Sequence, residues 1–101
     1  MEYRTTPRLL LEFSVSLNYP SLGLITGKVK NISPNGAFVA TQAVKIPRHQ
    51  LLEMTFKFPG ETPAKIHRLG AMVVHVAQDG MGLMFVDAEA QVLNSFTRFR
   101  S

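Results

Sequence analysis

Apolar and polar residues alternate with a period of two over long stretches of this chain. The segment LLLEFSVSLN, residues 9–18, follows this pattern, and LLEMTFKF, residues 51–58, repeats it. Such alternation is typical of β-strands with one buried face, because successive side chains of a strand point to opposite sides of its sheet. The chain is therefore expected to build its core from sheet faces.

Turn-forming residues divide the rest of the sequence into short strand candidates. Pro, Asn, Gly and Ser gather in YPSLG, NISPNG and PGETP, and QDG carries the Asp-Gly signal of a hairpin. Gly70 lies within an apolar run, where it indicates a bulge or bend. In the tail, Val92, Leu93 and Phe96 lie at helical spacing, and Asp87 suits an N-cap. The expected strands are residues 9–18, 24–32, 36–41, 51–58, 64–77 and 81–86.

Six short strands followed by one helix predict an all-β fold, either a barrel or a sandwich. A barrel is favoured because closure removes the edge strands, which a chain this apolar could not safely expose. The length of 101 residues suits one domain. We predict a flexible N-terminal arm at residues 1–8, a six-stranded antiparallel β-barrel at 9–86 and a C-terminal α-helix at 87–100.

The composition excludes several classes of protein. With 46% apolar and 18% charged residues, the chain can fill a core and does not resemble a disordered segment. It has no cysteine, so disulfides, thiolate metal sites and a cysteine nucleophile are excluded. The apolar runs are too short to cross a bilayer, and the N-terminus has no signal-peptide pattern. We expect a cytoplasmic protein without membrane insertion.

The sequence contains no recognisable catalytic or metal-binding pattern. Its three histidines, His49, His67 and His75, lack metal-ligand spacing and an acidic partner at a recognisable offset. The carboxylates are scattered, and there is no Gly-rich phosphate loop of the GxxxxGK[ST] type. His75 lies on the polar side of MVVHV and is expected to be exposed. We expect a binding module rather than an enzyme, with no metal and no cofactor.

Two short motifs remain as candidate binding features. RTTPR carries Arg4 and Arg8, and the net charge of +4 also favours an anionic partner. Arginine binds phosphate and the guanine edge through two parallel hydrogen bonds, and its planar face stacks on bases. In NISPNG, Asn31 and Ser33 lie two apart at a strand end, so they point the same way, while Gly36 lets a backbone come close. These three residues would form a polar ledge for a ring edge or a phosphate, although a plain turn also explains them.

The order of three segments resembles the PilZ domain family. RTTPR precedes the first strand, NISPNGAFV follows the second, and GMGLMF occupies residues 80–85. The resemblance covers essentially the whole chain. It implies a six-stranded barrel with a C-terminal helix that binds the bacterial second messenger cyclic di-GMP, with Arg4 and Arg8 as the RxxxR motif and Asn31, Ser33 and Gly36 as the [D/N]xSxxG motif.

The resemblance also implies a mechanism. The arm would fold over the ligand and set its two guanidinium groups against guanines and phosphates, while Asn31 and Ser33 would hold a guanine from the barrel side. Without a second domain, the protein would signal through a partner protein in trans, by ordering its arm.

Two other functions remain open. A domain of the same fold could be a protein-interaction adaptor in motility or pilus assembly that does not depend on cyclic di-GMP. A small basic barrel could instead bind single-stranded nucleic acid, which requires aromatic side chains on an exposed strand face. Phe13, Phe56 and Phe58 fall on the apolar faces of their strands, so DNA or RNA is not the expected partner.

Overall fold

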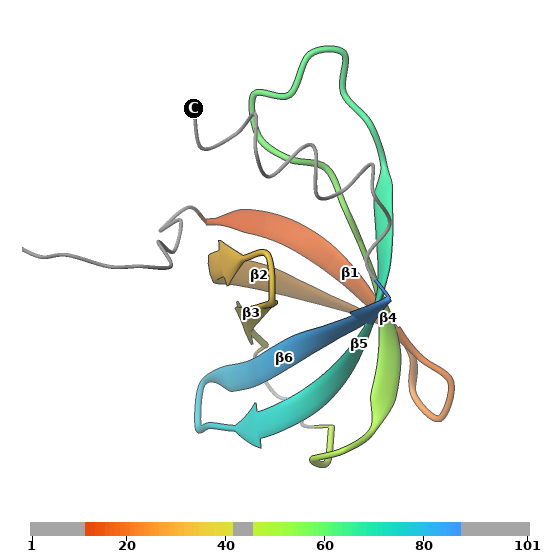
Figure 1. Cartoon of the computed structure of the whole chain (residues 1–101). Coiled ribbons are helices and arrows are strands. Elements are labelled where there is room, and N and C mark those ends of the chain that lie inside the picture. The colour runs from red at the N-terminus through yellow and green to blue at the C-terminus, as the bar shows by residue number, and fades with distance from the viewer. Residues whose placement is uncertain (1–11, 42–45, 88–101) are drawn as a thin grey trace, which may run out of the picture.

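The barrel predicted from the sequence is the fold of the computed structural model, which describes residues 12–41 and 46–87. Six antiparallel strands close in the order β1-β2-β3-β6-β5-β4 (Figure 1). The predicted arm at 1–8 lies outside the described residues, as does the predicted helix apart from Asp87, which is the last residue of β6. The strands are β1 (Phe13–Tyr19), β2 (Gly23–Ser33), β3 (Gly36–Ala40), β4 (Leu51–Phe56), β5 (His67–Val76) and β6 (Gly80–Asp87).

The period of two gives the barrel an apolar interior. On β4, Leu52, Met54 and Phe56 are buried as predicted, whereas Glu53 is exposed. Each strand contributes its apolar face to the same core, because the barrel has only one inside. The largest fully buried side chains are Leu17, Ile32, Ile46, Met54, Leu69, Met81, Val29, Val39 and Val73.

A bulge on β2 reverses the alternation shortly before the strand ends. The register with β3 shifts between Val29 and Asn31, so Lys30 is an extra residue on β2. A bulge of this kind exchanges the two faces for every residue that follows it. Val29 and Ile32, three positions apart, are therefore both fully buried inside the barrel. Asn31 and Ser33 consequently belong to the outer face.

The pairing of β5 with β6 is irregular at two places. Between Gly70 and Ala71 the extra residue is Val86 on β6, so the irregularity lies beside the predicted glycine while β5 keeps its alternation, with Leu69 and Ala71 both buried. Between Val73 and His75 the extra residue lies on β5 and has the same effect as Lys30 on β2. Strict alternation from the buried Val73 would put His75 inside the barrel. Because Val74 is an extra residue, His75 is exposed, as predicted, for a reason that its neighbours in the sequence do not reveal.

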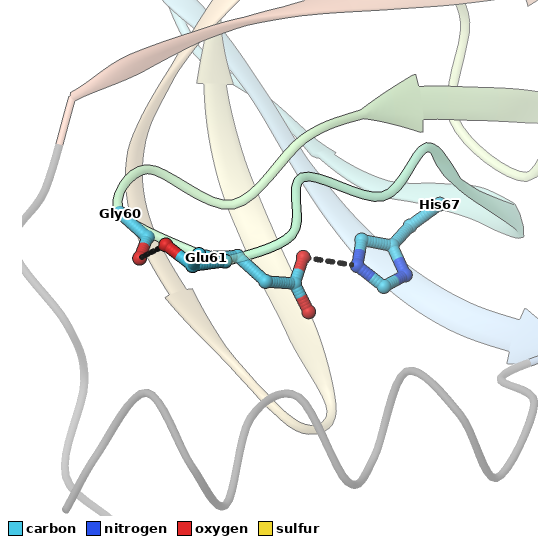
Figure 2. A network of polar contacts seen from close by, with 4 residues as sticks. Gly60, Glu61 and His67 are labelled. Atoms are coloured by element: carbon cyan, nitrogen blue, oxygen red, sulfur yellow. Dashed lines mark hydrogen bonds and ion pairs between the residues drawn. The ribbon is translucent and has the colours of Figure 1, made fainter.

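The connection between β4 and β5 is tied to the barrel by a buried pair. Nε2 of His67 lies 2.9 Å from Oε1 of Glu61, and both side chains are almost fully buried (Figure 2). The imidazole also packs against the rings of Phe56 and Phe58, at centroid distances of 5.5 and 5.2 Å. No recognisable offset in the sequence revealed this acidic partner of His67, because the loop folds back over six residues.

Candidate functional site

The NISPNG segment forms a tight hairpin between β2 and β3. β2 ends at Ser33 and β3 begins at Gly36, so Pro34 and Asn35 alone make the turn. The amide of Asn35 donates to Oγ of Ser33 at 3.3 Å, and the carbonyl of Asn35 accepts from the amide of Phe85 on β6 at 2.9 Å. The turn is thus fixed at both its base and its tip.

The hydroxyl of Ser33 takes part in the turn itself. Besides accepting from the Asn35 amide, it donates to the carbonyl of Gly36 at 3.5 Å, and the residue is only 4% exposed. A hydroxyl has one proton and two lone pairs, so one acceptor position remains and the long bond to Gly36 is weak enough to be exchanged. The plain turn that the sequence also allowed for Ser33 is therefore part of its role in the structure.

The absence of a side chain at Gly36 is required by the barrel. A Cβ atom built there would overlap the carbonyl oxygen of Leu83 on β6. Gly36 pairs with Met84, and its φ is not positive. Other residues are therefore excluded by the lack of space for a Cβ atom and not by a special backbone angle. The close approach predicted at this glycine is therefore made by the neighbouring strand.

Asn31 lies in a row of outer-face residues that crosses four strands. It pairs with Phe38 on β3, Phe38 pairs with Gly82 on β6, and Gly82 pairs with His75 on β5. We call Asn31, Phe38, Gly82 and His75 the outer row. Together with Val74, these residues line a surface hollow of about 380 Å³. The hollow is concave, uncharged and bordered by one amide and two rings.

The structure brings together the three residues of the second motif, Asn31, Ser33 and Gly36. All three lie at the end of the β2–β3 hairpin, as the motif requires. Arg4 and Arg8 lie outside the described residues, so their position relative to the outer row stays a prediction.

Positive charge adjoins the outer row on β2. Nζ of Lys30 lies 2.9 Å from Oε2 of Glu12, and Lys28 is exposed two positions earlier. The hydrogen bond from Lys30, helped by its charge, lowers the pKa of Glu12 below its ordinary value of 4.5. This pair neutralises one of the two lysines locally, and the outer face of β2 keeps a basic character.

Sequence reasoning missed the other members of the outer row. Phe38 and Val74 were expected only as parts of strands, His75 only as an exposed residue, and Gly82 only as a glycine of strand packing. These residues lie together because of the bulges on β2 and β5. Lysine at position 30 and valine at position 74 are not residue types that indicate a bulge. These residues could have been found from the bulges, which often lie next to functional sites. The bulges are visible only in the pairing of the strands and not in the sequence.

Other site types have no counterpart in the described residues. Across 12–41 and 46–87, no three His, Cys, Asp or Glu side chains gather where they could hold a metal ion. No helix in the same part of the chain is long and apolar enough to cross a bilayer. Phe13, Phe56 and Phe58 pack on one another, with centroids 5.1–6.2 Å apart, so these rings form no exposed stacking surface.

Comparison with known families identifies the class of this domain. Residues 2–99 match the PilZ domain, and the chain belongs to the PilZ domain family. This is a family of receptor and adaptor domains of the cyclic di-GMP-binding type. The resemblance inferred from the three motifs is thereby confirmed. No curated protein matches the chain.

Solved structures share the fold at low sequence identity. The structure of the Bacillus subtilis inhibitor of motility, MotI/DgrA, is similar with a TM-score of 0.81 and 16% identity over 98% of this chain. The match covers 50% of that protein, so the chain spans half its length. The PilZ domain of CeSA from a cellulose-synthesizing bacterium is similar with a TM-score of 0.70 and 17% identity, over 92% of this chain and 93% of the other.

Proposed function

We propose that this protein is a receptor for cyclic di-GMP and binds it on the outer face of the barrel at the end of the β2–β3 hairpin. The observation that carries the proposal is the grouping of Asn31, Ser33 and Gly36 at this hairpin, beside an uncharged hollow, in a chain of the PilZ family. Asn31 contributes an amide donor and acceptor to a guanine edge, and Ser33 contributes one remaining acceptor.

The arginines of the arm complete the site. Arg4 and Arg8 close over the ligand and make charge-assisted hydrogen bonds to its phosphates, which are stronger than neutral ones. Ordering the arm costs conformational entropy, so the affinity is moderate and the ordered arm is the signal that a partner protein reads. The protein works in the cytoplasm and needs no cofactor.

Isothermal titration with cyclic di-GMP tests this proposal. Wild type binds at low salt, and Arg8→Ala weakens binding at least tenfold because a charge-assisted contact is lost. Arg68→Ala is the matched control: it removes the same charge from an exposed position on β5, seven residues or about 23 Å along the strand from His75. No heat of binding from wild type at about 100 µM ligand would reject the proposal.

The alternative is an adaptor that contacts its partner without cyclic di-GMP. One surface observation favours it: Leu51, Met72 and Met84 pair in succession across β4, β5 and β6 on the outer face. Leu51 is 60% and Met84 is 42% exposed. The similar structure of an inhibitor of motility is consistent with this role.

Partner binding separates the two functions. If the receptor function holds, cyclic di-GMP changes the affinity for the partner and Arg8→Ala abolishes that change. If the adaptor function holds, the partner binds equally well with and without the dinucleotide, and Met84→Ala weakens the interaction where Arg8→Ala does not.

A further inference from the structure

The hollow beside Asn31 has a glycine floor between two ring-bearing residues. Gly82 on β6 pairs with Phe38 on one side and with His75 on the other. Side chains stand roughly perpendicular to their sheet. Two rings therefore rise on either side of a position that has no side chain.

The space above this floor is open. Among the described residues, a Cβ atom built on Gly82 would approach only His75, at 3.2 Å from its Cβ and 4.0 Å from its carbonyl oxygen. The Phe38 ring leans along β6 toward Gly80, where a built Cβ would lie 2.9 Å from Cε2 of the ring. The ring thus borders the hollow without covering Gly82.

The bulge on β5 builds the wall opposite Phe38. Because Val74 is the extra residue, both Val74 and His75 face outward at the position of Gly82, and both are exposed. A regular strand would offer only one side chain there and would turn the imidazole inside. The barrel core does not need this irregularity, since Val73 is already fully buried.

We propose that His75 is a stacking wall that holds one purine base of the dinucleotide over Gly82, between its imidazole and the Phe38 ring. The inference rests on the proposed function and adds a specificity-determining residue to that site. The Cβ atom built on Gly82 lies 3.2 Å from that of His75, and a usual cross-strand spacing of about 4.5–5.5 Å to Phe38 puts the two flanking residues about 8–9 Å apart. A flat base with a van der Waals contact on each face needs about 7–8 Å.

The chemistry of the hollow suits a base better than a phosphate. Its lining residues carry no carboxylate, ammonium or guanidinium group. Histidine and phenylalanine rings are side chains on which unpaired bases stack. The amide of Asn31 then meets the edge of the base.

Titration calorimetry of three variants tests the wall. His75→Ala weakens cyclic di-GMP binding about tenfold, within the range for loss of one base–aromatic stack. His75→Phe restores the flat face and binds within about threefold of wild type. Leu24→Ala, which removes a 74% exposed side chain seven residues before Asn31 on β2, is the control and leaves affinity unchanged. If His75→Ala binds as wild type, or His75→Phe is as weak as His75→Ala, the stacking role is wrong.

Filling the floor provides a second test that leaves both rings in place. Gly82→Ala puts a methyl group under the base, where only the exposed His75 has to yield by a few tenths of an ångström. The variant stays folded and binds cyclic di-GMP at least tenfold more weakly; unchanged affinity contradicts the site. If wild type does not bind cyclic di-GMP, the proposed function is rejected. If wild type binds and the His75 and Gly82 variants bind with the same affinity, only this inference is rejected.

Discussion

Gly36 on β3 lies so close to the carbonyl of Leu83 on β6 that a Cβ atom would overlap the oxygen. The glycine of the [D/N]xSxxG motif is thus required by the packing of the barrel, independently of any ligand. A substitution at this position consequently affects stability and binding together.

Gly36→Ala is expected to destabilise the protein by about 2 kcal/mol or more, because a backbone oxygen cannot move aside as a flexible side chain can. Chemical denaturation measures the loss. Gly82→Ala is the comparison, since its new methyl group meets only an exposed residue. Equal stability of the two variants would contradict the close approach of β3 and β6.

Ser33→Ala is expected to lower the free energy of unfolding by about 1 kcal/mol, because the Asn35 amide loses its acceptor. The same variant weakens cyclic di-GMP binding if the remaining acceptor of the hydroxyl meets the ligand. Denaturation and calorimetry on one preparation separate the two effects. A variant with reduced stability and wild-type affinity would restrict Ser33 to the turn.

Asn31→Asp is expected to keep the fold and to bind cyclic di-GMP more weakly at low salt, because it adds a negative charge on the face that receives a dianion. The difference in affinity between the variant and wild type should become smaller as salt is raised, since the Debye length falls to about 8 Å at 0.15 M ionic strength. Titrations over a salt series measure this. A gap independent of salt would point to a lost hydrogen bond instead.

Glu61→Ala is expected to lower the free energy of unfolding by about 1–3 kcal/mol, because His67 is left buried without its partner. Glu61→Gln keeps an oxygen at the same place and should cost less. Denaturation curves of the two variants give the order. If both variants were as stable as wild type, the pair would not anchor the β4–β5 connection.

The ion pair of Glu12 and Lys30 predicts a weak pH dependence. The lowered pKa of Glu12 means that its contribution to stability is present above its ordinary value of 4.5 and is lost as the pH falls through the lowered value. Glu12→Gln should therefore be slightly less stable than wild type at neutral pH, and the difference should disappear as the pH falls through the lowered pKa. A difference that grows in acid would contradict the assigned pair.

Strand positions could be read from the sequence because burial imposes a period of two on each strand. β4 illustrates this: Leu52, Met54 and Phe56 were assigned inward and are buried. The buried pair of Glu61 and His67 could not be found in this way. It depends on how the loop folds back, and no local pattern encodes that path.

The sequence by itself determined the barrel and the hairpin that carries Asn31, Ser33 and Gly36. Alternation of apolar residues fixed the strands and the core, and turn chemistry fixed the hairpin between Ser33 and Gly36. Only the tertiary structure decided which residues share the outer face. A bulge is an irregularity in the pairing of two strands. Lys30 and Val74 therefore reverse the inward and outward alternation of side chains, although neither residue type indicates a bulge. That reversal is why Asn31 and His75, far apart in the chain, line one hollow.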